Sequence, residues 1–188
     1  MKLQKGDYGY LSNRKRMQLI KVIIGIVLVF AVLFTGIITT GTKNNLLTVG
    51  SILLVLPTAN FAVNLIAMMK FKRLKQAEYD EFSKAAEGKV TSCDMLVTAN
   101  QKLVPLPVSI IYKNGIVSYT NLSEKFNRKD AEEDMNRLLK SIGCPVGIKI
   151  MNEWKPFIRQ VQSIEAPATD EERQKLDEIK YDLLKYSM

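Results

Sequence analysis

The sequence predicts a mixed α/β domain of the α+β kind, facing the cytoplasm and carried on a hairpin of two transmembrane helices. Three observations predict this class: two long apolar runs lie close together, basic residues cluster on their outer sides, and the apolar period changes to that of β-strands after residue 89. Within the domain we expect a three-strand meander, a helix, a fourth strand and a C-terminal helix. The 188 residues suffice for one modest core besides the hairpin.

Two apolar runs are long enough to cross a bilayer. Residues 22–38 and 46–69 carry no charge, and a hydrocarbon core of about 30 Å needs about 20 helical residues. We therefore expect spans at about 20–40 and 46–69. A signal peptide is the alternative for the first run, but the run is longer than usual and no cleavage motif follows before Lys43. Two buried helices of a soluble protein are the other alternative, which the short connection between two wholly apolar helices disfavours.

The charge distribution indicates membrane topology. The formal net charge is +8. Residues 1–75 hold 11 basic residues and one acid, a balance of +10, whereas residues 76–188 hold 16 basic and 18 acidic residues, a balance of −2. The positive charge therefore surrounds the apolar runs, and we expect no nucleic acid as a partner.

Basic residues also set the expected orientation. They flank both runs on their outer sides, while the connecting loop carries only Lys43. By the positive-inside rule both termini are cytoplasmic, in an integral protein of, we expect, a bacterial plasma membrane. The same side chains are predicted to contact lipid head groups. They are Arg14, Lys15, Arg16, Lys70, Lys72, Arg73 and Lys75.

Small and polar residues inside the apolar runs predict helix packing, within the hairpin or between copies. In each run they share one helical stripe. In a hairpin centred near Lys43, Asn64 is expected at about the depth of Gly25. A polar pathway for an ion or a small solute is the alternative. The predicted packing residues are Gly25, Gly36, Gly50, Pro57, Asn60 and Asn64.

The segments around the hairpin follow from composition. Residues 1–19 form a basic cytoplasmic segment, and residues 20–69 form the hairpin. Residues 70–88 are expected to continue the second span as a juxtamembrane stalk helix that ends at Gly88. The α/β domain then occupies residues 89–188.

The first half of the domain reads as strands. Residues 93–99, 107–112 and 116–121 are rich in β-branched and aromatic side chains. Asn114 and Gly115 predict a tight hairpin turn between the last two. Pro105 and Pro107 predict that the second strand begins at an edge or a turn.

The second half reads as helix, strand and helix. Residues 128–143 carry acids in the first turn and end at a glycine, as a helix favours, and residues 146–151 read as a strand. Residues 152–165 fit either a strand or a short helix. A last helix is expected from about Thr169, which begins a capping box, to Tyr186.

The order α-β-β-β-α-β, over roughly residues 76–151, resembles the core of restriction-endonuclease-like folds. The resemblance implies magnesium held by an acid on one strand and an acid-x-lysine motif on the next. Strand 116–121, where the acid-x-lysine motif is expected, has neither an acid nor a lysine. Asp94 lies one strand before the expected position of the acid, and Lys149 has Gly147 instead of an acid two residues before it. No site is therefore carried over.

No residue pattern indicates an active site. The chain has no histidine, which excludes Ser-His and Cys-His catalysis, and Cys93 and Cys144 are expected to be free thiols. Asp94 and Glu153 are the acid pair considered for catalysis. We expect no cofactor and no metal.

The expected function is a two-span anchor that presents a protein-interaction domain at the inner membrane face. Its expected partners are the membrane and another protein, or a second copy through self-association. Enzymatic activity is open but not favoured. The alternatives are a membrane-anchored nuclease-like or lipid-substrate enzyme and a small oligomeric transport subunit.

Overall fold

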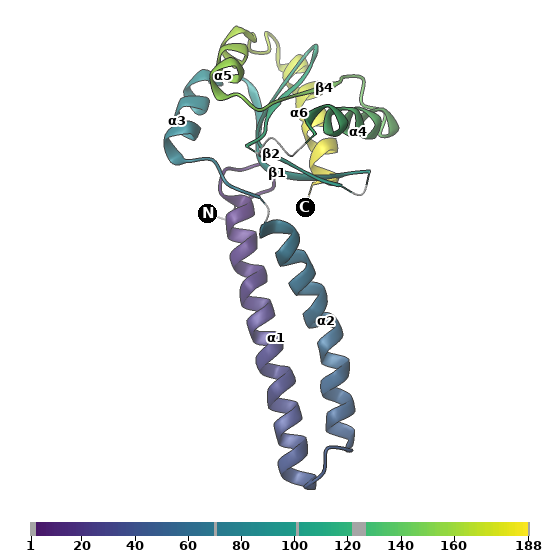
Figure 1. Ribbon diagram of the computed structural model, residues 1–188. Helices are drawn as coiled ribbons and strands as arrows, with labels where there is room; N and C mark the ends of the chain where they lie inside the picture. The colour runs from purple at the N-terminus through teal and green to yellow at the C-terminus, as the bar shows by residue number, and fades with distance from the viewer. Residues whose placement is uncertain (1–2, 70, 101, 122–126, 188) are drawn as a thin grey trace. The chain divides into compact units, whose positions relative to one another are not determined.

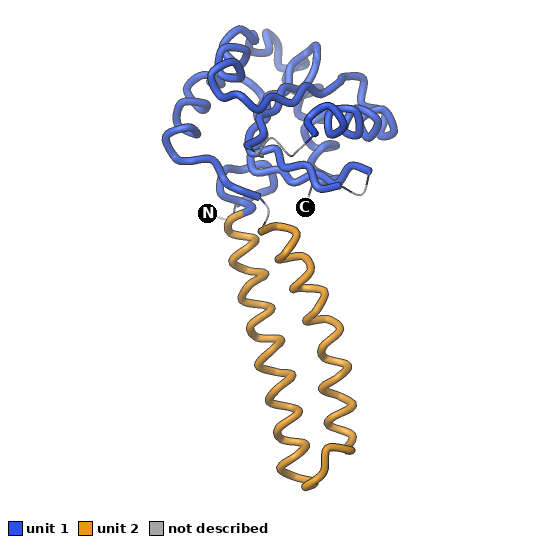
Figure 2. Tube along the Cα trace, viewed as in Figure 1, with its two compact units in different colours: residues 1–11, 71–188 blue, residues 12–70 orange. Residues whose placement is uncertain are grey.

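The computed structural model describes residues 3–69, 71–100, 102–121 and 127–187. In these residues it confirms the mixed α/β class, with six helices and a four-stranded sheet (Figure 1). The chain divides into two compact units, coloured in Figure 2. Residues 1–11 and 71–188 form the α/β unit, and residues 12–70 form the hairpin unit. The α/β unit is therefore discontinuous in sequence, because the hairpin is inserted between residues 11 and 71.

The predicted meander is confirmed. The strand order is β1-β2-β3-β4, with antiparallel pairing from β1 to β3 and parallel pairing of β4 with β3. The strands are β1 (Val90–Ala99), β2 (Lys102–Tyr112), β3 (Gly115–Tyr119) and β4 (Ile148–Met151). A hairpin joins β2 and β3 as predicted, but its two-residue turn is Lys113-Asn114, because Gly115 begins β3 and pairs with Tyr112. The turn therefore lies one residue before the predicted Asn114-Gly115 pair, and neither residue of that pair has the positive φ that such a turn requires.

The start of β2 lies at an edge, as its prolines predict. β2 begins earlier than expected and contains both Pro105 and Pro107. Pro105 pairs with Leu96 of β1, whereas β3 pairs with residues 108–112 of β2, beyond both prolines. A residue without an N–H is tolerated there because β3 is not hydrogen-bonded to this part of β2.

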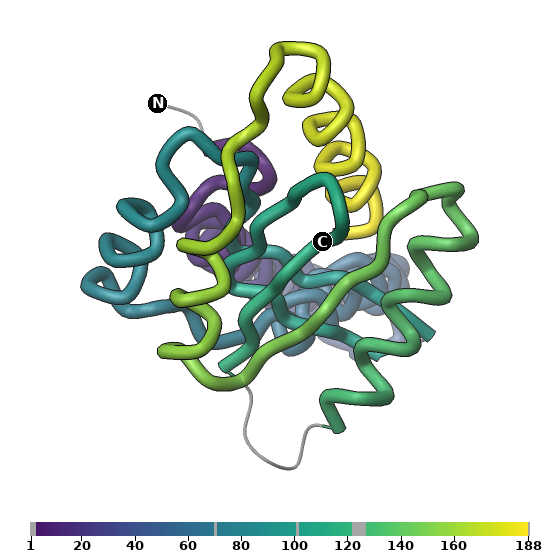
Figure 3. Tube along the Cα trace, turned by 90° about the horizontal axis from the view of Figure 1, so that it is seen from above, coloured from purple at the N-terminus to yellow at the C-terminus, as the bar shows by residue number. Residues whose placement is uncertain are grey.

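Four helices cover the two faces of the sheet (Figure 3). They are α3 (Gln76–Ala85), α4 (Arg128–Ser141), α5 (Trp154–Ser163) and α6 (Asp170–Lys185). Helices α4 and α6 pack on one face, and α3 and α5 pack on the other. The ranges of α4 and α6 agree with the predicted helices, and residues 152–165, which fitted either type, contain α5.

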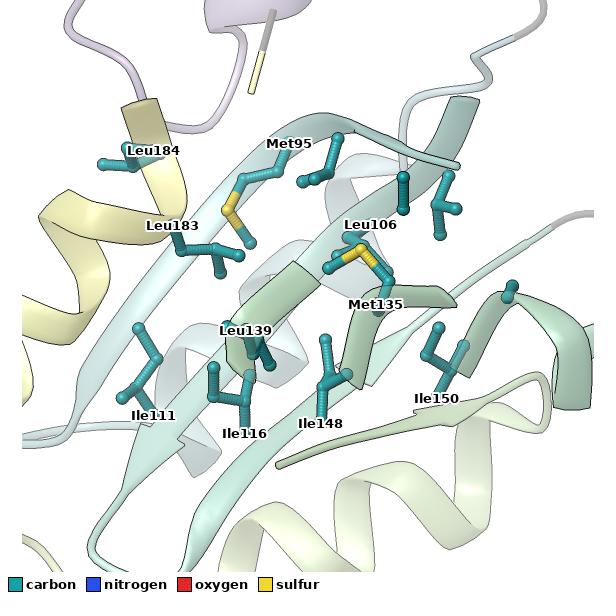
Figure 4. Close-up of a cluster of buried hydrophobic side chains, with 14 of the residues drawn as sticks. Met95, Leu106, Ile111, Ile116, Met135, Leu139, Ile148, Ile150, Leu183 and Leu184 are labelled. Carbon is teal, nitrogen blue, oxygen red and sulfur yellow. The ribbon is translucent and has the colours of Figure 1, made fainter. Parts of the chain in front are cut away.

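The larger core lies between the sheet and helices α4 and α6. Figure 4 shows Met135 and Leu139 of α4 and Leu183 of α6 turned toward the sheet. Full burial of a side chain of this size contributes about 1.5–3 kcal/mol. β2 is buried on both faces, and its sequence reads as a nearly continuous apolar run. β1 is buried to a similar extent but includes the polar residues Ser92 and Asp94.

Lys89 joins the two helices on the opposite face. Its Nζ donates to Ala85 O at 3.0 Å and to Val161 O at 2.8 Å, near the C-terminal ends of α3 and α5. A cation at these carbonyls is favoured by both helix dipoles. Burial lowers the pKa of Lys89.

The predicted continuous stalk helix is wrong. The second apolar helix ends at Met69, residues 71–75 are not helical, and α3 begins at Gln76. Leu74 and Phe82 are buried in one cluster with Val108 of β2. Their burial against the sheet explains why this segment folds into the α/β unit instead of extending the preceding helix.

Candidate functional site

The hairpin unit contains two helices that are long and apolar enough to cross a membrane, α1 (Tyr10–Thr40) and α2 (Leu46–Met69). In the most apolar window of each helix only 6% is buried, whereas a core helix of a soluble protein would be mostly buried. Among the described residues, exposed large apolar side chains outside 17–69 are limited to Leu3, Tyr181 and Tyr186. The hairpin thus carries an apolar surface of the kind that a bilayer covers.

The two helices approach closely at two glycines. A Cβ atom on Gly25 would lie 2.5 Å from Thr58 Oγ1, so a larger residue requires the helices to move apart. A Cβ atom on Gly36 would lie 2.7 Å from Asn45 Oδ1 and 2.9 Å from Leu47 Cβ. The structure therefore places Gly25 and Gly36, two of the predicted packing residues, in the contact between α1 and α2.

The predicted register of the hairpin is wrong. Thr58, not Asn64, lies beside Gly25, and the six-residue difference corresponds to about 9 Å along a helix. The cause lies in the turn, where Asn45 Oδ1 accepts the Thr48 N–H at 2.8 Å and caps the start of α2. With this cap, α2 starts beside Gly36 rather than beside the end of α1.

The other predicted packing residues lie apart from this close contact. Pro57 borders a hollow of about 220 Å³ between α1 and α2, whereas no atom lies within 4 Å of a Cβ placed on Gly50. Asn60 is exposed and Asn64 is half-buried. Neither asparagine side chain makes a hydrogen bond to another described residue.

The hydroxyl groups of the two helices bond to their own backbone. Thr58 Oγ1 donates to Leu54 O at 2.8 Å, and Ser51 Oγ donates to Thr48 O at 2.7 Å. Thr35 in α1 donates in the same way to Ala31 O at 2.8 Å. Such bonds let a hydroxyl reside in an apolar environment without an external partner.

The basic residues predicted at the lipid surface have different surroundings. Four of them are exposed: Arg16, Lys72, Arg73 and Lys75. The guanidinium carbon of Arg73 lies 3.9 Å from the ring centroid of Tyr8, while Arg14 and Lys15 are half-buried. Lys70 lies outside the described residues. Contact with lipid head groups stays a prediction for this set.

Residues 3–9, here called the strap, pack along the outer edge of β1. The Cys93 N–H donates to Gly6 O at 2.7 Å, and the Gly9 N–H donates to Oδ2 of the buried Asp94 at 2.7 Å. Gly6 and Gly9 have φ values of +93° and +92°, which favour glycine. The strap therefore supplies a neighbour to a strand edge that would otherwise be open.

Tyr8 connects the strap to the segment that follows α2. Its ring stacks on Tyr79 of α3 with 3.7 Å between centroids, and its hydroxyl donates to Leu74 O at 3.1 Å. Arg73 covers the ring as described above. The chain before α1 and the chain after α2 are thus fastened to each other and to the α/β unit.

Further along β1, the C-terminal residues cover the same edge. The Leu96 N–H donates to Ser187 Oγ at 3.2 Å, and the Thr98 N–H donates to Tyr186 O at 3.4 Å. Lys5 Nζ of the strap donates to Ser187 O at 2.8 Å. Both ends of the chain therefore share in closing the β1 edge.

Side chains of α4 cover the opposite edge of the sheet, at β4. Asn136 Oδ1 accepts the Ile148 N–H at 2.8 Å, and Asn136 Nδ2 donates to Ile148 O at 3.1 Å. Glu132 Oε2 accepts the Ile150 N–H at 3.2 Å. Since β1 and β4 both have other partners, binding of a peptide by strand addition is disfavoured.

A cleft of about 540 Å³ opens on the α/β unit, within the size range of ligand pockets. Leu176, Ile179 and Val146 supply buried or half-buried apolar groups. Lys113 Nζ lies 3.8 Å from Glu172 Oε1 in the same cleft. The cleft residues are Tyr112, Lys113, Pro145, Val146, Glu165, Ala166, Pro167, Ala168, Glu172, Lys175, Leu176 and Ile179.

The acid pair and the thiols have clear positions. Asp94 is buried beneath the strap and Glu153 is exposed at the start of α5, and no hydrogen bond or ion pair joins these two described residues.

Cys93 and Cys144 are free, as predicted. The pKa of the Cys93 thiol is raised to about 12, mainly by burial and in second place by the nearby charge of Asp94. The thiol therefore stays protonated at neutral pH and is a poor nucleophile. Within the described ranges no three His, Cys, Asp or Glu side chains are grouped to hold a metal ion.

Two groups of residues escaped prediction from the sequence. Thr58 lies on the face of α2 that contacts α1, but its hydroxyl gives no sequence signal distinct from an ordinary helical threonine. The strap carries a weak signal, the Gly6 and Gly9 pair around Tyr8, which indicates a non-helical turn before α1.

Comparison of the chain with protein-family models, curated proteins and solved structures gives no match. The observed order α3-β1-β2-β3-α4-β4 agrees with the order expected from the sequence. The resemblance to restriction-endonuclease-like folds rests on this order alone, and it carries no argument for function.

Proposed function

We propose that this chain is an integral membrane protein whose two-span hairpin holds the α/β unit at the cytoplasmic face of a plasma membrane, where the unit binds another protein. The observation that carries the proposal is the exposed apolar surface of α1 and α2. In water, this surface would drive aggregation, whereas a bilayer covers it. Beyond its first turn, such a helix satisfies its backbone N–H groups internally, as a membrane span requires.

The basic residues support the orientation. Six Lys and Arg residues precede the first apolar run, while Lys43 is the single one in the connecting loop. Translocation of the loop, with its one basic residue, across the membrane is favoured over translocation of the basic segments that flank the two spans. The α/β unit then lies on the cytoplasmic side, because it follows the second span.

Two features of the α/β unit support binding of a partner protein in the cleft. Both sheet edges are covered, by the strap and C-terminal residues at β1 and by Asn136 and Glu132 at β4. The cleft combines apolar groups with two lysines and two glutamates. This composition suits a peptide segment that presents an apolar side chain between charged ones. An enzyme would also use a cleft with clustered charges, and the experiment below distinguishes the two.

The experiment uses the full chain in native membranes. A photoreactive amino acid replaces Lys175 in the cleft or, as a matched control, the exposed Lys155 on α5. An interaction unit gives a discrete protein adduct from position 175 and none from position 155. Equal adducts from both positions, or adducts with small molecules alone from position 175, contradict the interaction role. Release of the chain by alkaline carbonate contradicts the anchoring role.

A further inference from the structure

Asn60 lies on the side of α2 that points away from α1. Thr58 faces Gly25 of α1. Because each residue of an α-helix turns by about 100°, the side chain of Asn60 lies about 160° from that of Thr58 around the helix axis. Asn60 is exposed, and its amide makes no hydrogen bond to another described residue. Unlike the hydroxyls of Thr58 and Ser51, an amide has two N–H donors and an acceptor to satisfy.

The depth of Asn60 makes this exposure costly under the proposed function. It precedes Met69, the last residue of α2, by nine residues, which corresponds to about 13 Å along a helix. That distance is close to half of a hydrocarbon core of about 30 Å. Lipid chains offer neither donors nor acceptors, so the amide requires a polar partner from protein.

Apolar residues flank Asn60 at alternating spacings of four and three. This is the heptad spacing of a left-handed coiled coil, and it places Asn60 at one central position of the seam. Leu53 is 61% exposed, Leu56 70% and Val63 64%, so the part of the seam around Asn60 takes no part in the contact with α1. The seam residues are Val49, Leu53, Leu56, Asn60, Val63 and Ala67.

We propose that α2 associates with α2 of a second copy of this chain through the seam, with the two Asn60 amides hydrogen-bonded to each other. The proposal rests on the membrane anchoring proposed above. In a two-fold pair of parallel helices, equivalent residues face each other at the same depth. Each amide then meets the one group that complements it fully, a second amide. A single buried asparagine in a heptad seam also fixes the register of the pair.

The first experiment compares two single cysteines at the same depth of the full chain in membranes. Leu56→Cys lies in the seam, and Val55→Cys lies about 100° away on an exposed face. Both are made with Cys144→Ser, and Cys93 is buried. Under mild oxidation we expect L56C to form a disulfide-linked product of twice the chain mass, and V55C to stay monomeric.

The second experiment removes the amide. Asn60→Leu is expected to lower the association constant of L56C chains by about 3- to 30-fold, the range given by measured interhelical hydrogen bonds. Asn60→Gln keeps the amide and is expected to restore most of the association. Asn44→Leu, the same substitution at an exposed loop residue, is expected to change nothing.

Three results would overturn the inference: equal crosslinking of L56C and V55C, an unchanged association constant for N60L, or an L56C product with the mass of a different partner. Carbonate extraction separates this inference from the proposed function. A chain retained in the membrane whose L56C form stays monomeric overturns self-association alone. A chain released by carbonate overturns both.

Discussion

Tyr8 offers a direct test of the discontinuous α/β unit. The unit can be prepared without the hairpin by joining residues 3–11 to residues 71–187. Tyr8 Oη lies 3.1 Å from Leu74 O, so the two ends are within reach of a Gly/Ser linker of about eight residues. The perturbation is then Tyr8→Ala in this joined unit.

The expected loss follows from three contacts of Tyr8. The hydroxyl bond to Leu74 O contributes about 0.5–1.5 kcal/mol, and the stack on Tyr79 contributes about 0.5–1.5 kcal/mol. The cation–π contact with Arg73 adds about 0.5–1 kcal/mol at an exposed site. Since the contacts share one ring they are not additive, and we expect about 2–3 kcal/mol in total. Tyr8→Phe should lose about 1 kcal/mol, because the stack remains.

Thermal unfolding measures this loss. For a unit of this size, 1 kcal/mol corresponds to about 3–5 °C in Tm, so Y8A should melt about 6–15 °C below the unsubstituted unit. Tyr181→Ala removes a tyrosine that is 64% exposed on α6 and serves as the matched control, with little change expected. A Y8A melting temperature equal to that of Y181A would refute the assignment of the strap to the α/β unit.

Three further predictions concern single residues. Gly25→Ile should separate α1 from α2, because its Cβ atom would lie 2.5 Å from Thr58 Oγ1; disulfide formation between cysteines at Leu28 and Leu54 should fall, and unchanged yield would contradict the hairpin contact. Asn136→Ala should lower the free energy of unfolding by about 1–3 kcal/mol, because it removes the partners of Ile148 at the β4 edge; denaturant titration checks this, and a loss below about 0.5 kcal/mol would be inconsistent with an edge cap. Burial raises the pKa of Cys93 from 9.0 to about 12. The unfolded chain therefore releases this proton first, and its contribution to stability, full below pH 9, should be lost as pH rises toward 12; Cys93→Ala should flatten that dependence in a pH series of unfolding curves.

Local signals predicted the elements of the α/β unit well. The Asn114-Gly115 pair placed the β2–β3 hairpin to within one residue of the observed turn, and Asn127 and Thr169 cap α4 and α6 within a few residues of the predicted starts. The features that were predicted wrongly depend on contacts between residues far apart in the sequence. The break between α2 and α3 depends on burial of Leu74 and Phe82 against β2 and α5, which no local pattern reveals.

In the candidate site, too, local signals predicted some features, while others depend on distant contacts. Gly25 and Gly36 were predictable because small residues in an apolar run permit close helix packing. The register was not, because it depends on how Asn45 caps α2 after the turn. The packing of the strap on the α/β unit was also not predictable, since Tyr8 and Leu74 are 66 residues apart in the sequence. Asn60 is a separate case. The sequence shows an asparagine inside an apolar run, but only the structure shows that it lies on the side of α2 that points away from α1.

The orientation of the chain in the membrane is tested most directly through its own cysteines. Cys93 is buried with a raised pKa, whereas Cys144 is partly exposed between α4 and β4. Cys144 is therefore the natural reporter for the α/β unit, and Lys43→Cys with Cys144→Ser reports the loop. With a membrane-impermeant maleimide, Cys144 should label only after the cells are permeabilised, while K43C should label in intact cells. Labelling of Cys144 in intact cells would contradict a cytoplasmic α/β unit held by a two-span hairpin.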